Sequence, residues 1–142
     1  MKVRTIGYWT ATTLLVSAML SGGLAELTRQ PQTIEGMARL GYPAYFILIL
    51  GFWKVLGSAA LLAPGFSRLK EWAYAGIFFN MTGAAVSHAV SGSPAWHIPV
   101  TLGFAALAVI SWALRPARRT LGTLGALFAG RPAEVVGEYA RS

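Results

Sequence analysis

Lys54 is the residue with the clearest chemical potential in this chain, because it lies near the middle of the otherwise uncharged apolar run Tyr42–Leu62. A charge at the centre of a membrane-spanning helix costs about 2.5–3.5 kcal/mol on translocon scales, so it is seldom kept without a partner or a purpose. Its ammonium can meet carbonyl oxygens or Asn80 and only fix helix register. Alternatively, it can line a polar cavity for a small molecule. A desolvated lysine also loses its proton more easily, which suits proton relay or covalent chemistry.

Other polar side chains lie within or beside the apolar runs. Counting from the run ends places Asn80 at the depth of Lys54, and places Glu26, Ser87 and His88 nearer the far surface. We expect a polar track leading down to Lys54, with these five residues as the ligand-binding candidates. His88 is a ligand, a proton relay or a satisfied interfacial histidine. Glu26 is either a helix-end carboxylate in water or the counter-ion of His88.

The remaining composition offers little for metal or covalent catalysis. The chain has two histidines, no cysteine and no aspartate, so the third or fourth ligand of a metal site is hard to find. No phosphate loop, nucleophile elbow or pair of catalytic carboxylates occurs. The sequence therefore predicts no metal site, names no catalytic residue and favours a protein that is not an enzyme on its own.

Four apolar stretches are long enough to cross a bilayer, whose hydrocarbon core takes about 20 residues to span. With 55% hydrophobic and 12% charged residues, a soluble domain of this size would have too little polar surface. We expect an all-α fold, an antiparallel bundle of four transmembrane helices over residues 1–119, with a short outer surface helix at Thr33–Leu40. Residues 120–142 are expected to form a basic cytoplasmic tail that is surface-bound or disordered. The four stretches are Ile6–Ala25, Tyr42–Leu62, Trp72–Val90 and Trp96–Leu114.

The net charge of +7 is explained by topology better than by nucleic-acid binding. If the N-terminus is cytoplasmic, the inner side carries nine basic residues and the outer side only Arg29 and Arg39. The positive-inside rule then places both termini in the cytoplasm. The nine are Lys2, Arg4, Arg68, Lys70, Arg115, Arg118, Arg119, Arg131 and Arg141.

Small residues form stripes on the second and third apolar stretches, at steps of three and four residues. Small side chains let membrane helices approach closely. We therefore expect the two stripes to pack against each other, with Lys54 and Asn80 between them. The interface residues would be Gly51, Gly57 and Ser58 on one helix and Gly76 and Gly83 on the other.

Five strings together resemble the DoxX-like family of small bacterial membrane proteins, over about residues 6–119. They are Gly41-Tyr42-Pro43, Lys54-Val55-Leu56-Gly57, Lys70-Glu71-Trp72-Ala73-Tyr74-Ala75-Gly76, Gly83-Ala84-Ala85-Val86-Ser87-His88 and Ser111-Trp112-Ala113-Leu114-Arg115-Pro116. The resemblance implies a four-helix domain in the bacterial inner membrane, mostly without an assigned reaction, and it directs attention to Lys54, Glu71, Asn80 and His88.

Family relatives are associated with a thiosulfate:quinone oxidoreductase, and others resemble membrane partners of redox-stress systems. A cysteine-free chain lacks the residues expected for sulfur chemistry, so that activity is not transferred. The leading hypothesis is an accessory protein that binds a small amphiphile, a quinone or a lipid, in its bundle. One alternative is a dimeric proton-coupled transporter, although Glu26 lies too near the surface to be its embedded carboxylate. Another is the membrane subunit of a quinone-linked oxidoreductase complex.

Overall fold

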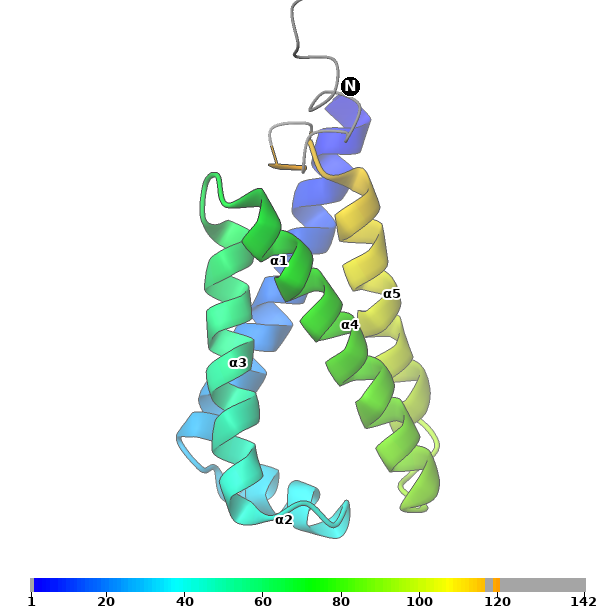
Figure 1. Ribbon diagram of the computed structural model, residues 1–142. Coiled ribbons are helices and arrows are strands. Elements are labelled where there is room, and N and C mark those ends of the chain that lie inside the picture. Colours follow the sequence, from blue (N-terminus) through cyan, green and yellow to red (C-terminus); the bar gives the residue numbers. More distant parts are fainter. Residues whose placement is uncertain (1, 117–118, 121–142) are drawn as a thin grey trace, which may run out of the picture.

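The computed structural model describes residues 2–116 and 119–120, and within them the chain is helical with no strand. The helices are α1 (Lys2–Leu27), α2 (Pro31–Arg39), α3 (Ala44–Leu62), α4 (Ser67–Val90) and α5 (His97–Leu114). Figure 1 shows α1, α3, α4 and α5 as long rods, with the short α2 across one end. The short helix begins earlier than expected because Pro31 suits a first helical turn. The expected tail lies outside the described residues except for Thr120.

The helices α1, α3 and α5 are long and apolar enough to cross a membrane. Large apolar side chains also face outward, including Phe52 at 56%, Phe79 at 71% and Ile110 at 48% exposure. Such a surface suits lipid better than water. The chain is therefore a membrane protein.

The helix α4 differs from the expectation of a fourth span equal to the others. It is 24 residues long, about 36 Å at 1.5 Å per residue, so its length suffices. Its first five residues include Arg68, Lys70 and Glu71, and Asn80 and His88 interrupt its apolar character further along. The count of strongly apolar candidate spans in the described residues is therefore three.

A short turn joins α3 to α4. Pro64 follows the end of α3 and cannot donate a helical hydrogen bond. Gly65 and Phe66 then adopt left-handed conformations, with φ of 70° and 49°. This reversal brings the end of α3 beside the start of α4.

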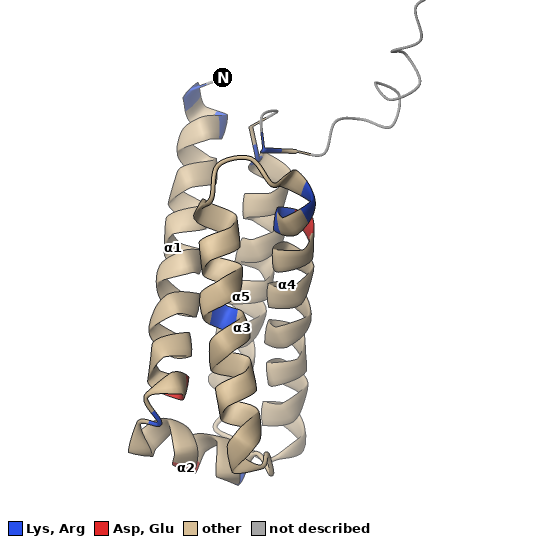
Figure 2. Ribbon diagram, turned by 60° about the vertical axis from the view of Figure 1, so that its left-hand side comes forward, with Lys and Arg blue, Asp and Glu red and all other residues tan. Residues whose placement is uncertain are grey.

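Basic residues lie where α1 begins, where α4 begins after its turn from α3, and where α5 ends (Figure 2), and we call this end of the bundle the basic end. The opposite end carries α2, and α3 and α4 diverge toward it (Figure 1). The buried apolar core lies mainly between α1, α4 and α5, with one contribution from the end of α3. It contains Leu15, Val16, Met19, Leu61, Tyr74, Ile77, Met81, Ala105 and Ala108.

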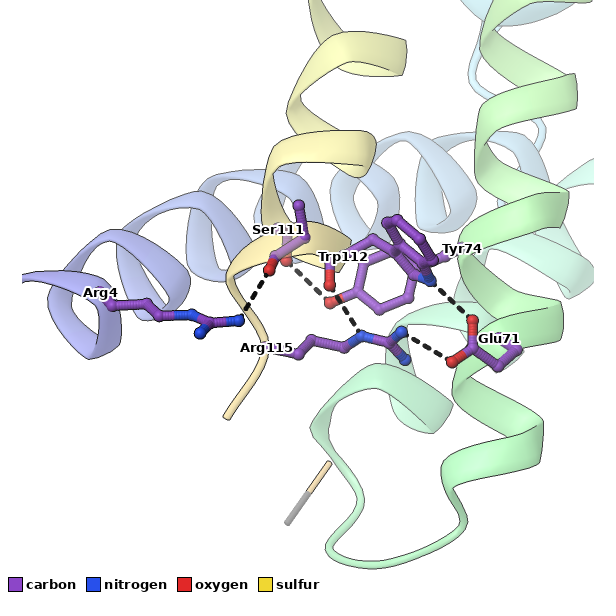
Figure 3. A network of polar contacts seen from close by, with 7 residues as sticks. Arg4, Glu71, Tyr74, Ser111, Trp112 and Arg115 are labelled. Atoms are coloured by element: carbon purple, nitrogen blue, oxygen red, sulfur yellow. Dashed lines mark hydrogen bonds and ion pairs between the residues drawn. The ribbon is translucent and has the colours of Figure 1, made fainter. Parts of the chain in front are cut away.

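A polar network closes the basic end (Figure 3). Arg115 donates to Glu71 at 2.7 Å, and the indole Nε1 of Trp112 donates to the other oxygen of Glu71 at 2.6 Å. The Ser111 hydroxyl lies 2.8 Å from both the Tyr74 hydroxyl and the Thr12 hydroxyl. Side chains from α1, α4 and α5 are thereby joined by directional bonds.

Two further cations at the basic end bind the end of α3. Lys70 donates to the carbonyl oxygen of Ala60 at 2.8 Å and also to that of Ala63. Arg119 donates to the carbonyl oxygen of Leu61 at 3.0 Å. The last carbonyls of a helix lack partners within it, so these side chains satisfy groups that would otherwise be buried unpaired.

We predict that Glu71→Gln lowers the melting temperature in detergent. The change replaces the carboxylate that accepts from Arg115 with a neutral amide, while Arg115 stays buried. Buried polar groups that lose their partner cost about 1–3 kcal/mol. Glu35→Gln is the matched control, because the Glu35–Arg39 pair is exposed and such pairs contribute little. Equal melting temperatures for the two variants would show that the Glu71 network does not stabilise the fold.

Candidate ligand-binding site

The helices α1 and α3 cross closely at two glycines. A Cβ atom at Gly51 would lie 2.8 Å from the carbonyl oxygen of Gly23, and one at Gly23 would lie 3.0 Å from that of Gly51. Real Cβ atoms essentially never come as near as 2.8 Å, so this crossing requires glycine at position 51, and the space at position 23 is also tight. It brings the backbones together in the way that small residues allow in membrane proteins.

Lys54 forms an ion pair with Glu26 across this crossing. Both side chains are largely buried, at 13% exposure for Lys54 and 7% for Glu26. The ammonium passes beside Gly22, where a Cβ would lie 3.9 Å from Nζ. Glu26 is therefore neither a carboxylate in water nor the counter-ion of His88, and that expectation was wrong. The flexible lysine side chain reaches the carboxylate in the last turn of α1.

Two polar atoms near this pair have no hydrogen-bond partner among the described residues. One is Glu26 Oε2, the second oxygen of the carboxylate, and the other is His88 Nδ1. The His88 ring stacks on that of His97 at 4.5 Å between centroids, and His97 stacks on Trp96 at 3.7 Å. The stack holds the His88 ring in place, so Nδ1 is a positioned group.

A cavity of about 420 Å³ borders both Glu26 and Lys54. Its other polar side chains are those of Tyr42, of Asn80 and His88 on α4 and of Thr101 on α5. The rest of its lining is mostly apolar or aromatic, and includes Met37, Leu40, Tyr42, Phe46, Leu50, Phe79, Met81, Gly83 and Ala84. The cavity can offer hydrogen bonds to a small polar group.

A second cavity of about 340 Å³ lies between α3 and α4. Its lining is apolar apart from Lys54 and Asn80, and includes Leu50, Trp53, Leu56, Gly57, Ala60, Leu69, Trp72, Ala73, Gly76 and Ile77. Trp53 and Trp72 are 61% and 79% exposed, so this cavity opens at the surface of the bundle. Leu50, Lys54 and Asn80 border both cavities.

Four of the five expected site residues therefore surround one cavity: Glu26, Lys54, Asn80 and His88. Ser87 does not border it. Its hydroxyl lies 2.6 Å from that of Tyr42, which does. Sequence reasoning missed Tyr42 and Thr101, since Tyr42 precedes Pro43 and looked like part of a helix boundary.

The expected contact between the two glycine stripes differs from the structure. Gly51 packs against α1, and nothing lies within 4 Å of a Cβ at Gly57, Gly76 or Gly83. Those three glycines border the cavities instead. Ser58 is buried and donates to the carbonyl oxygen of Lys54. The helices α3 and α4 diverge, so their small residues leave space between them.

Comparison with known protein families shows which family the chain belongs to. The sequence model of the DoxX-like family matches residues 10–111, which include every residue of the site. The chain belongs to the DoxX-like family. No curated protein and no solved structure matches the chain. Within the part of the DoxX-like chain that the structure describes, no three histidine, cysteine or acidic side chains gather to hold a metal ion.

We predict that Gly51→Ala lowers the melting temperature, because its methyl group would meet the Gly23 carbonyl oxygen and force α1 from α3. Gly57→Ala is the control. Its methyl group meets open space, and alanine favours a helix over glycine by about 1 kcal/mol. Circular dichroism during heating in detergent would measure both. An unchanged Gly51→Ala variant would mean that the crossing is looser than described.

Proposed function

We propose that this DoxX-like protein binds a small amphiphile, a quinone or a lipid, between α3 and α4 as an accessory to a membrane redox or stress system. The observation that carries the proposal is that one apolar and one partly polar cavity share Leu50, Lys54 and Asn80. An amphiphile likewise consists of an apolar part and a polar head. Its apolar part suits the cavity between α3 and α4, and its polar head suits the side chains around Lys54.

The dimensions favour a small ligand. Sites for small molecules commonly measure about 300–1,000 Å³ and combine apolar walls with a few placed polar groups. Each cavity alone lies in this range, at about 340 and 420 Å³. The aromatic rings of Tyr42 and Phe46, stacked at 4.9 Å, border the polar cavity and offer a flat apolar wall.

The route of entry is from the bilayer. The exposed side chains at the mouth of the apolar cavity are Trp53, Leu56, Leu69 and Trp72, and all of them suit contact with lipid. A lipid-soluble ligand can thus move sideways between α3 and α4 without passing through water. The basic end, where α3 and α4 meet, closes the route on that side.

The same proposal includes a topology. With α4 as a fourth span, α1, α3, α4 and α5 form an antiparallel bundle in the inner membrane, and the basic end faces the cytoplasm. The excess of basic residues at that end supports this orientation. The polar cavity then lies toward the outer side, with α2 beside it.

Proton-coupled transport by a dimer is the second candidate, and one observation favours it. Glu26 is a buried carboxylate paired with Lys54, which is the embedded acid that such transport needs. Reconstituted vesicles with a pH-sensitive dye would distinguish the two functions. Substrate-dependent proton uptake favours transport, whereas saturable binding without proton movement favours the accessory role.

We predict that Gly57→Leu abolishes binding of a decyl-substituted benzoquinone and retention of co-purified lipid. The new side chain would occupy the apolar cavity, which Gly57 borders with free space around it. The melting temperature should not fall, because leucine is a better helix former than glycine. Tryptophan fluorescence quenching and mass spectrometry of the purified protein would report binding.

Gly103→Leu is the matched control for this experiment. Gly103 also has free space around it, and it lies on the exposed surface of α5. This variant should bind like the wild type. Undiminished binding by Gly57→Leu would contradict the proposed site.

A further inference from the structure

We infer that the polar cavity selects amphiphiles whose neutral head group carries a hydroxyl, and that it rejects both ethers and anionic head groups. The inference rests on the proposed function and names the class of head group. It starts from Glu26, which is 5% exposed. Its carboxylate oxygen Oε2 accepts no hydrogen bond from any described residue. A buried acceptor of this kind is stabilised by a donor, and the carboxylate borders the cavity.

Among the described residues no side chain donates to Oε2, and this includes Asn80 and His88. Lys54 pairs with Oε1, the other oxygen of the carboxylate. The remaining polar side chains of the cavity are those of Tyr42, Asn80, His88 and Thr101. The Tyr42 hydroxyl is paired with Ser87, and the Thr101 hydroxyl donates to the carbonyl oxygens of its own helix. A ligand is therefore the natural source of a donor.

Charge decides against an anionic head group. Of the described residues that border the cavity, Lys54 and Glu26 alone carry a formal charge, counting histidine as neutral, and the two charges cancel. A carboxylate or phosphate would meet Oε2 of Glu26 without a free cation to offset the repulsion. The other cations of the helices lie mainly at the basic end (Figure 2), away from α2.

A hydroxyl fits better than a group that only accepts or only donates. It can donate to the carboxylate and accept from the Asn80 amide, which also borders the cavity. A methyl ether keeps the acceptor and loses the donor. The hydroxyl can belong to an aromatic ring or to an aliphatic chain, and the two sources share this chemistry.

The test compares four probes on the purified full-length protein in detergent, by competition against a bound fluorescent amphiphile. The probes are 4-dodecylphenol, 1-tetradecanol, 4-dodecylanisole and dodecanoate. We expect the phenol, the alcohol or both to bind at least about tenfold more tightly than the anisole, as loss of a hydrogen bond to a charged group implies. Dodecanoate should bind more weakly than either hydroxyl probe. The ratio of phenol to alcohol distinguishes an aromatic from an aliphatic source.

Glu26→Gln tests the assignment to one atom. Lysine can only donate, so the amide oxygen should turn to Lys54 and the amide NH₂ group should replace Oε2. The acceptor becomes a donor at constant size, and the preference for the hydroxyl probes over the anisole should disappear. Glu35→Gln, on α2 outside the cavity lining, should keep the preference.

The outcomes separate the two levels of the proposal. If no probe binds the wild type, the proposed function fails and this inference fails with it. Binding of both hydroxyl probes no tighter than the anisole, tightest binding of dodecanoate, or a hydroxyl preference that survives Glu26→Gln overturns the selection of a hydroxyl head and leaves amphiphile binding standing.

Discussion

The ion pair between Lys54 and Glu26 is the interaction on which the rest of the structure depends. An ammonium in the middle of an apolar helix needs a counter-charge, and Glu26 at the end of α1 supplies it. The pair forms because α1 and α3 approach closely, and that approach needs glycine at position 51 and leaves little room at position 23. The charge, the glycines and the helix crossing are thus parts of one arrangement.

The arrangement also explains why the bundle is open on one side. Since α3 packs on α1 near Lys54, it diverges from α4 toward α2 (Figure 1). At the basic end, Lys70 and Arg119 hold the last carbonyls of α3. The result is a bundle closed by hydrogen bonds at one end and separated by cavities along α3 and α4. A membrane protein with such an opening is suited to ligands that arrive through lipid.

Much of this could be predicted from the sequence, because apolar length and polar interruption are local properties. The approximate positions of the long helices follow from them, as does the placement of Lys54, Asn80 and His88 around one cavity, whereas α2 and α4 begin earlier than expected. Packing partners were harder to predict. At 3.6 residues per turn, Gly51 and Gly57 point about 120° apart, with Lys54 between them. Treating all three residues as one face of the helix concealed that Gly51 faces α1 and that Gly57 borders the apolar cavity.

The role of Glu26 could not be predicted for a related reason. Its position at the end of an apolar stretch indicates contact with water, and only the crossing of α1 and α3 shows that the lysine stem reaches it. The network of Glu71 and Arg115 was likewise hidden, although the resemblance to the DoxX-like family had directed attention to Glu71. Long-range pairs of this kind depend on helix geometry that no local pattern contains.

The most direct test of the central claim is a double-mutant cycle on Lys54→Met and Glu26→Gln, measured as the free energy of unfolding in detergent. Removing Lys54 alone leaves a buried carboxylate without its cation, and breaking a buried pair typically costs about 3–5 kcal/mol. We predict that the double variant is more stable than Lys54→Met, with a coupling energy above about 1 kcal/mol. Additive effects of the two changes would contradict the pair, and with it the description of the cavity.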